Sequence, residues 1–590
     1  MRSHSPAIIA NATLDGTEVS TGPTDLVVGD GDGVGLGLRN PILPGFNPDP
    51  SIIRVEGDYF LTTSTFEYFP GLPIYHSRDL VNWTLIGHVL TRASQLDLRT
   101  VPPGGGIFAP TLRYWKGRYY VTVCAVHNRT WGEDEDLRCW PRGFYVWTDN
   151  IWDQDSWSEP TYYDVLGIDQ DLFFDDYDQV YLSIAKPIHD ASVHHTGFDA
   201  GVYTAPIDLA SGRTLEPLKL MRYSTVGNGC CEGPHIFKRG RYYYLITAEG
   251  GTEIEHQEWV CRSTAGPMGP WEVGPVGTVN PMVYNGDHPQ IRQTGHMDIV
   301  EGTQGQWWAV VLAVRPVWEG SVGEKDVGPR LSQLGRETFL APICWEDDWP
   351  IINNRRAITI NAPTEGVMAD LPRTPQVFEE ASDFAPGMVL SKSGWYRLRT
   401  PVTAHDHSLT DRPGSLTLYG GPYHIRVDES PTLFLRKQTS FEGVWSVRLD
   451  YPKIEIGHEA GTAVWWSKWA FASIGLRGRE GGRDLVFRFP NRVGNEFQDT
   501  IISDINDGPI EFQIQAYPTE YHFAIRSAVD EEFRPVGVIS SQVLVRTRPF
   551  DSLFTGTHFA IFAMGTRQQG SLRPAHFDRV RWRGVRQGGK

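Results

Sequence analysis

The sequence predicts an all-β protein in which a five-bladed β-propeller is followed by an antiparallel β-sandwich. Short runs rich in aromatic and β-branched residues fill the chain, and strong helical periodicity is missing almost everywhere. One sequence unit occurs five times before residue 350, which is typical of propeller blades. From about residue 394 the runs alternate apolar and polar residues with regular turns, which indicates a sandwich.

Each repeated unit starts inside an apolar run, passes through a turn followed by aromatic residues, and in four of the five units ends near a tryptophan. The first unit runs from Asp49-Pro50-Ser51-Ile52 through GDYFLTT to Trp83. The five starts, which lie 60, 60, 64 and 63 residues apart, are Asp49, Ala109, Asp169, Gly233 and His296. Because this period accommodates several short strands, we interpret each unit as one blade.

Equivalent positions of the five units are expected to converge on one axis, because the innermost strand of every blade lines the central channel. Asp49, Asp169 and His296 would meet there, with Glu232 next to Gly233. Such a cluster of acids is unfavourable unless a ligand, a proton or a metal balances it. The convergence therefore predicts a functional site.

The length of 590 residues indicates two domains or more. We expect a poorly ordered extension over 1–38 and a propeller over 39–350. A linker rich in Pro, Asp and Glu over 351–385 and a sandwich over 386–590 complete the chain.

The net charge of −17 argues against nucleic acid and anionic membranes as partners, and fits a neutral or cationic ligand. No apolar run reaches the roughly 18 residues of a membrane span. The first 38 residues hold no apolar segment of signal-peptide length, which favours a cytoplasmic location over secretion and leaves the compartment open. Buried thiols without zinc spacing are expected for the six cysteines, Cys124, Cys139, Cys230, Cys231, Cys261 and Cys344.

Asp49 lies between Pro48 and Pro50, neither of which donates an N–H, so it cannot be an ordinary mid-strand residue. A turn-forming role is the alternative to catalysis, and the matching carboxylates of later units favour catalysis. Asp169 lies in the acidic run DQDLFFDDYDQ, where only its repeat position distinguishes it.

Glu232 precedes the repeat position by one residue, so strand alternation would point it away from the axis. A bulge at Gly233 would return it. An acid beside Cys231 and near aromatic strands would have a raised pKa, as a proton donor requires, although a turn cap is the alternative. Glu249 and Glu253 are the next candidates for the acid.

Four further side chains are candidates for the site. His296 is a core histidine or a ligand of water or metal. Arg336 either forms a surface ion pair or uses the two ends of its planar guanidinium to bind sugar hydroxyls or a carboxylate. Phe66 and Phe108 would stack on a sugar or belong to the core.

Carboxylates at the mouth of a channel suit glycoside hydrolysis, in which one acid protonates the leaving oxygen and one base activates water. A separation of about 6.5–9.5 Å between the two groups inverts the anomeric configuration.

At these residues the chain resembles glycoside hydrolase family 43, in the two-domain branch of β-xylosidases and α-L-arabinofuranosidases. The motifs that carry the resemblance from about Asn40 to Trp349 are NPILPGFNPDPSI, GIDQDLFFDD, EGPHIFK, GHMDIVE and GRETFL. The segments LTDRPGSLTLYG, SPTLFLRKQ and PAHFDRVRW are similar to the concanavalin-like sandwich of that branch.

The resemblance implies Asp49 as general base, Asp169 as the carboxylate that orients and tunes the acid, and Glu232 as general acid. It also implies Arg336 as a substrate contact and His296 near a water or a calcium ion, with no cofactor required. Phe108 stands where the family often has Trp, so the resemblance does not decide which sugar is released.

We therefore expect an exo-acting, inverting enzyme that releases a terminal pentose from xylo-oligosaccharides, with β-1,4-xylosidase as the first expectation. An α-L-arabinofuranosidase acting on arabinosyl-decorated xylan or on arabinan is the alternative. A glycan-binding propeller without catalysis is the alternative of another class, and a homo-oligomer stays open.

Overall fold

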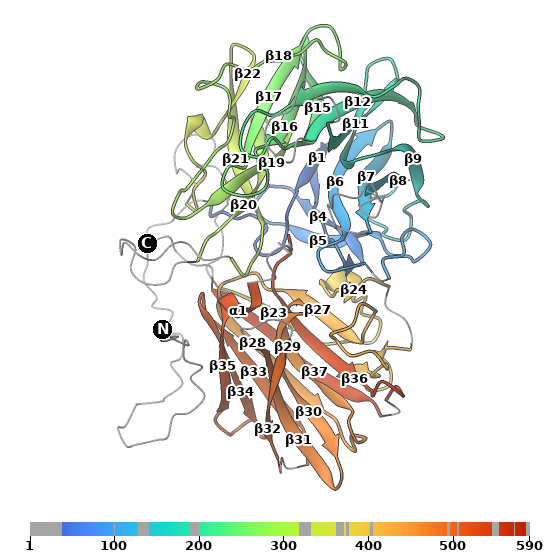
Figure 1. The fold of residues 1–590 in the computed structure, drawn as a ribbon, viewed down its shortest axis with the longest axis vertical. Helices are drawn as coiled ribbons and strands as arrows, with labels where there is room; N and C mark the ends of the chain where they lie inside the picture. Colours follow the sequence, from blue (N-terminus) through green and yellow to red (C-terminus); the bar gives the residue numbers. More distant parts are fainter. Residues whose placement is uncertain are drawn as a thin grey trace, which may run out of the picture.

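The computed structural model describes residues 38–585, except 100, 128–140, 189–199, 318–331, 362–370, 373–376, 402–404, 492–495, 504, 506, 546–553 and 572. Two all-β bodies lie one above the other in Figure 1, the propeller from the first part of the chain and the sandwich from the second. Within the described ranges the α-helical structure is limited to α1 (Ser541–Val545). In that same part of the chain, no helix has the length and apolar character that crossing a membrane requires.

The propeller consists of five antiparallel sheets that follow one another along the chain. The first sheet contains β1 (Ser51–Val55), β2 (Asp58–Thr62), β4 (Gly71–Ser77) and β5 (Thr84–Leu90). The second contains β6 (Gly106–Trp115), β7 (Arg118–Val126), β8 (Pro141–Thr148) and β9 (Thr161–Leu166). The third contains β10 (Ile168–Phe174), β11 (Val180–Pro187), β12 (Ala200–Asp208), β13 (Arg213–Thr214) and β14 (Lys219–Tyr223). The last two are β15 (Cys231–Arg239), β16 (Tyr242–Glu249), β17 (Gln257–Ser263) and β18 (Glu272–Val273); and β19 (Arg292–Glu301), β20 (Trp307–Val314), β21 (Glu337–Glu346) and β22 (Trp349–Ile352).

The first strands of the five sheets form the inner ring. Each of β1, β6, β10, β15 and β19 packs against its two neighbours in the ring, and β19 returns to β1. Among the described strands, no propeller sheet contains strands from both the first blade and the fifth. The ring therefore closes through side chains and single bridges, such as the one between Leu43 and Thr338, rather than through a shared sheet.

The repeat position carries the same unusual backbone in every blade. Left-handed φ angles of 53°, 31°, 54°, 56° and 43° occur at Asp49, Ala109, Asp169, Gly233 and His296. In the last four blades the pairing with the second strand is also irregular around this position. Because residues other than glycine rarely adopt this conformation, its recurrence shows that the inner strands bend in the same way at one level of the channel.

The sandwich has two antiparallel sheets. One contains β23 (Val377–Ser382), β25 (His407–Ser408), β26 (Leu416–Leu418), β28 (Glu442–Asp450), β33 (Ile510–Ala516), β34 (Glu520–Arg526), β35 (Arg534–Ser540) and β37 (Ala575–Val585). The other contains β27 (Leu433–Lys437), β29 (Glu459–Ser467), β30 (Ala470–Arg479), β31 (Gly482–Pro490), β32 (Phe497–Ile502) and β36 (His558–Met564). Strict alternation along β28 and β33 buries every second side chain, including Trp445 and Phe512, between the sheets.

The segment expected to be a linker contributes to the sandwich. β23 pairs with β37 in register from Val377 to Ser382. Its acidic residues made the segment look unstructured in the sequence, but charged side chains are typical of strands that protect the edge of a sheet.

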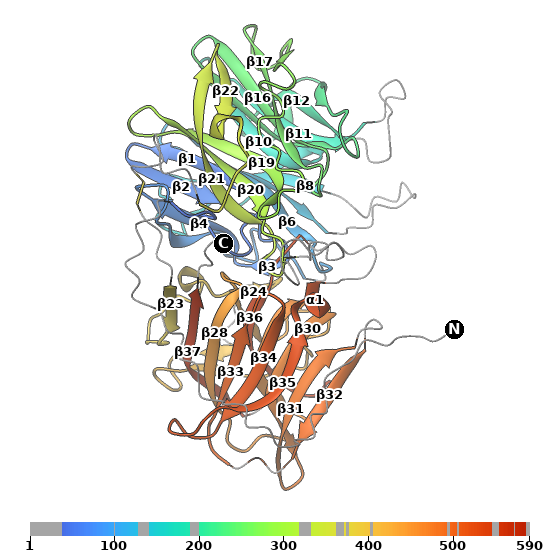
Figure 2. The ribbon, with the colours of Figure 1, turned by 90° about the vertical axis from the view of Figure 1, so that its left-hand side faces the viewer.

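The two domains share a packed interface. β3 (Tyr68–Phe69) pairs with β24 (Arg397–Leu398), and the Tyr68 hydroxyl donates to the Trp466 carbonyl at 3.3 Å. A Cβ on Gly335, where φ is 73°, would lie 2.5 Å from the Thr555 carbonyl oxygen, so close packing requires glycine there. Figure 2 shows the propeller seated on one end of the sandwich, and these contacts fix the sandwich beside the propeller.

The expectation of buried thiols is confirmed for Cys124, Cys230, Cys231 and Cys261. It is wrong for Cys344, which is exposed because it lies near the outer end of β21. Cys139 lies outside the described residues.

Candidate active site

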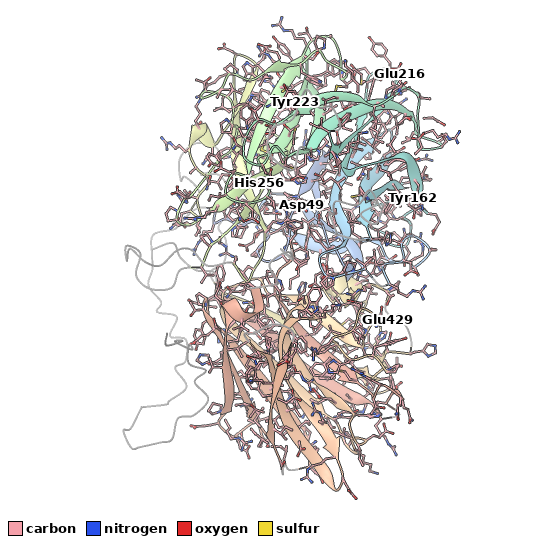
Figure 3. The ribbon with its side chains drawn as sticks, in the orientation of Figure 1. Asp49, Tyr162, Glu216, Tyr223, His256 and Glu429 are labelled. Atoms are coloured by element: carbon pink, nitrogen blue, oxygen red, sulfur yellow. The ribbon has the colours of Figure 1, made fainter. Side chains whose placement is uncertain are left out.

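Asp49 enters the channel just before β1 and is held by three side chains. The Ser64 hydroxyl donates to Oδ2 at 2.6 Å, and Arg336 Nη1 donates to Oδ1 at 3.2 Å. His296 Nδ1 lies 3.6 Å from the same Oδ1. Ser64 also accepts the Ala109 N–H at 2.7 Å, so residues of the first, second and fifth blades fix this carboxylate. Figure 3 labels Asp49 in the interior of the propeller.

A bulge brings Glu232 to the same level. The pairing of β15 with β16 shifts between Glu232 and His235, and Gly233 has a φ of 56°. The Gly233 N–H donates to Asp169 Oδ2 at 2.9 Å. Asp169 therefore holds the backbone immediately after Glu232.

Asp169 and Glu232 both have pKa values raised above those of ordinary carboxyl groups. Burial raises the pKa of Asp169 to about 7; His296 opposes this, and the charges of Glu232 and Asp49 add to it. Burial also raises the pKa of Glu232; the Cys230 thiol and Arg336 oppose this, and the Asp49 charge adds to it. Because burial disfavours charge and the acids repel one another, the site retains a proton near neutral pH.

Arg336 binds Asp49 rather than projecting freely toward a sugar. Its Nε donates to the Phe554 carbonyl at 3.4 Å, and its guanidinium lies 4.9 Å from the Phe554 ring. Phe554 belongs to the sandwich, so the second domain contributes to the surroundings of Asp49 and Arg336.

Of the two roles that the sequence left open for Phe66, stacking on a sugar or packing in the core, its burial fits the core. Phe66 is 1% exposed and packs at 4.8 Å from Phe108, which is 9% exposed, and at 6.1 Å from Phe554. Phe66 is therefore a core residue that packs behind Phe108, because Phe46 and Phe108 cover its ring.

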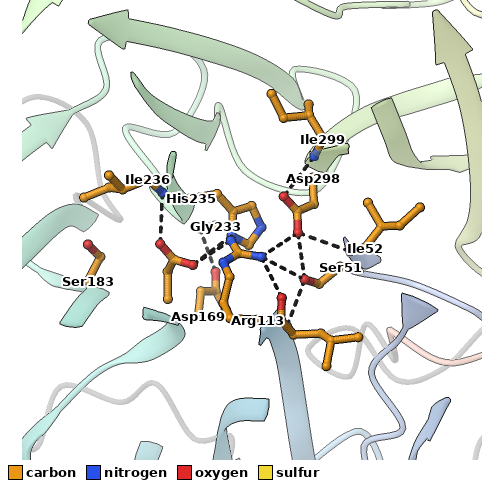
Figure 4. A network of polar contacts seen from close by, with 12 residues as sticks. Ser51, Ile52, Arg113, Asp169, Ser183, Gly233, His235, Ile236, Asp298 and Ile299 are labelled. Atoms are coloured by element: carbon orange, nitrogen blue, oxygen red, sulfur yellow. Dashed lines mark hydrogen bonds and ion pairs between the residues drawn. The ribbon is translucent and has the colours of Figure 1, made fainter. Parts of the chain in front are cut away.

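A calcium ion held through water was expected near His296, and the described residues do not fit one that they coordinate directly. None of their His, Cys, Asp and Glu side chains form a group of three that could hold a metal. Two nearby carboxylates, Asp171 and Asp298, instead accept bonds from the guanidinium of Arg113 at 2.7 and 2.9 Å (Figure 4). Calcium requires several free oxygen ligands, and these oxygens are already engaged.

The alternative acids have other partners. Glu249 is fully buried and bonds Arg222 Nε at 2.8 Å, which makes it part of a structural ion pair. Glu253 is exposed and accepts a bond from Gln293. Neither is among the groups whose charges shift the pKa values of Asp169 and Glu232.

Sequence reasoning missed Ser64, Phe554 and Arg113. No local pattern singles out Ser64 or Phe554. Arg113 did leave a signal, because it lies four residues after Ala109, where the other units carry the apolar residues Ile53, Phe173, Phe237 and Val300.

The chain is similar to several named glycosidases over most of its length. The relatives include a non-reducing end alpha-L-arabinofuranosidase of Bacteroides ovatus, 34% identical over 92% of this chain and 94% of that protein. They also include a xylan 1,3-beta-xylosidase of a Vibrio species, 31% identical over 92% of this chain and 98% of that protein. Among solved structures, a xylan beta-1,4-xylosidase from Bacillus halodurans superposes with a TM-score of 0.78 at 30% identity, covering 93% of this chain and all of that one.

Family models match both domains of the chain. Residues 387–583 match the beta xylosidase C-terminal concanavalin A-like domain. Residues 38–350 match the model of glycosyl hydrolases family 43, and the chain is a member of that family.

Proposed function

We propose that the protein is an exo-acting, inverting glycosidase that releases a terminal pentose, with β-1,4-xylosidase activity first. The observation that carries the proposal is the division of roles within one coupled group of acids. Asp49 is held by three side chains, while burial raises the pKa of Glu232. A charged base and a protonated acid are the pair that inversion requires.

In the proposed reaction, Asp49 accepts a proton from a water molecule as that water attacks the anomeric carbon. Glu232 donates its proton to the leaving oxygen as the glycosidic bond breaks. Ser64 and Arg336 keep the Asp49 carboxylate in one orientation, which lowers the cost of positioning it. Asp169 accepts the Gly233 N–H and so holds the backbone next to Glu232, while burial and the Asp49 charge raise the pKa of Glu232.

Exo action is supported by the position of the sandwich. Phe554 packs near Phe66, Phe108 and Arg336, beside the base. We infer that a second domain at this position leaves room for the end of a glycan chain, rather than for a glycan chain that continues on both sides of the cleaved bond.

The sugar and linkage are the part of the proposal that the test must decide. The relatives are named for β-1,3-xylosidase, β-1,4-xylosidase and α-L-arabinofuranosidase activities at similar identities. The arabinofuranosidase of B. ovatus therefore supports α-L-arabinofuranosidase activity as the second candidate.

Purified protein should be assayed with 4-nitrophenyl β-D-xylopyranoside and 4-nitrophenyl α-L-arabinofuranoside, and with xylobiose of β-1,4 and β-1,3 linkage. We expect release from the xyloside and from β-1,4-xylobiose, with the released xylose appearing first as the α-anomer in proton NMR. Higher kcat/KM on the arabinofuranoside would select the second candidate. Release from neither pentoside, with xylo-oligosaccharide bound and unchanged, would make the protein a glycan-binding propeller.

A further inference from the structure

A second polar ring lies two residues further along the inner strands than the active-site residues. We call it the clamp ring, and it consists of Ser51, Asp171, His235 and Asp298 around the guanidinium of Arg113. These side chains come from the first, third, fourth and fifth blades, and Arg113 comes from the second. One side chain therefore joins every blade of the propeller (Figure 4).

The bonds of Arg113 use both ends of its planar fork. Nη1 donates to Asp298 Oδ2 at 2.9 Å, to the Leu112 carbonyl at 2.9 Å, and to the Ser51 hydroxyl at 3.4 Å. Nη2 donates to Asp171 Oδ1 at 2.7 Å and to His235 Nδ1 at 3.0 Å. Because a guanidinium only donates, His235 accepts this bond at Nδ1.

The two carboxylates of the clamp ring are completed by backbone groups. Asp171 Oδ2 accepts the Ile236 N–H at 2.9 Å. Asp298 accepts the Ile299 N–H at 2.9 Å, the Ile52 N–H at 3.2 Å and the Ser51 hydroxyl at 2.7 Å. Arg113 therefore supplies the positive charge that two carboxylates, 0% and 5% exposed, require for burial.

This position matters for the whole propeller because no described sheet joins the first blade to the last. Asp298 of the fifth blade bonds Ser51 and Ile52 of the first blade, across the closure of the ring. A cation on the axis holds Asp298 in place for those bonds. Loss of that cation would leave two buried negative charges facing each other at the closure.

We propose that the Arg113 guanidinium is the built-in axial cation of this propeller and takes the place of a metal ion. The protein then needs no calcium, and removal of Arg113 creates a cation site from Asp171, Asp298 and the Ser51 hydroxyl. Oxygen ligands of this kind are those that Ca²⁺ prefers. The proposal rests on the contacts of Arg113 and is independent of which sugar the enzyme releases.

The test compares wild type, Arg113→Ala and Arg315→Ala after treatment with EDTA and dialysis, by thermal melting with and without millimolar CaCl₂ and by calorimetric titration with Ca²⁺. Arg315→Ala is the matched control, because Arg315 is a buried propeller arginine that binds one carboxylate, Glu337, at 2.6 and 2.8 Å. We expect no Ca²⁺ response in wild type or Arg315→Ala. Arg113→Ala should melt lower than wild type in EDTA and should regain about 5 °C or more in Ca²⁺.

Two further variants guard against a loss of folding. Arg113→Lys keeps the charge without the fork, and should melt between wild type and Arg113→Ala with no Ca²⁺ response. The double variant Arg113→Ala with Asp171→Asn removes one ligand and should lose the response to Ca²⁺. A Ca²⁺-dependent rise in the melting temperature of wild type would overturn the proposal. So would a folded Arg113→Ala that ignores Ca²⁺, or the same Ca²⁺ response in Arg315→Ala.

Discussion

The active-site residues and the clamp ring occupy neighbouring levels of one channel and have opposite electrostatics. Asp169 and Asp171 are two residues apart on β10, and both are buried. Burial, with the charges of Glu232 and Asp49 added, raises the pKa of Asp169 to about 7, and the one backbone N–H that it receives does not offset this rise. Asp171 instead receives a guanidinium bond at 2.7 Å.

Asp298 of the clamp ring gives the clearest contrast with Asp169. Burial raises the pKa of Asp298, but the opposing effects of Arg113, His235 and Ser51 are larger together. The net pKa therefore lies below its ordinary value. Burial alone therefore does not decide whether a carboxyl group keeps its proton. In the clamp ring one guanidinium bonds both carboxylates, whereas at the active-site level the Arg336 guanidinium bonds Asp49, and burial still raises the pKa values of Asp169 and Glu232.

The largest effect is expected from Asp49→Asn, because water attack is needed whatever group leaves. We expect kcat to fall by about 10³-fold or more on both xylobiose and an activated aryl xyloside. Steady-state kinetics on the two substrates measure this. A variant that keeps a tenth of the wild-type rate on either substrate would show that Asp49 is not the base.

Glu232→Gln should separate the two substrates. Xylobiose has a poor leaving group, so its turnover should fall by about 10²–10⁴-fold, whereas the activated aryl xyloside should lose about tenfold or less. The matched control is Glu249→Gln, because Glu249 is buried on the adjacent strand and binds Arg222 instead of the catalytic group. An equal loss on both substrates in Glu232→Gln would contradict the role of Glu232 as the acid.

The smallest effect is expected on stability, and it tests the contrast between the two levels directly. The raised pKa of Asp169 means that the folded chain holds a proton that the unfolded chain has released, so stability falls as the pH rises from about 4 to about 7. Asp169→Asn should remove this loss and raise the melting temperature at pH 8 by about 2–6 °C. The alkaline limb of the pH–rate profile should also move to lower pH, because a negative charge near Glu232 is gone.

Asp171→Asn is the counterpart on the other level. It removes a bond to Arg113, so the melting temperature should fall by about 5 °C or more while the limbs of the pH–rate profile stay in place. Melting curves and pH–rate profiles of both variants give the comparison. The contrast fails if both substitutions shift stability in the same direction at pH 8.

The sequence alone determined the blades, the repeat position and the three acids. The repeat is a local pattern of strand, turn and strand, so the inner strand of each blade can be recognised within its own unit. Because the inner strands line one channel, the five equivalent positions must meet on one axis. Even the offset of Glu232 was predictable, because Gly233 is a residue that permits the bulge found between Glu232 and His235.

Only the tertiary structure decided which partners these acids receive. Arg336 is 287 residues from Asp49 in the chain, and Asp298 is 185 residues from Arg113. Phe554 reaches the site from another domain. A charge on the axis becomes a base, an acid or a clamp according to the donors that other blades place beside it, and those donors leave no local pattern because their spacing is set by the closed ring.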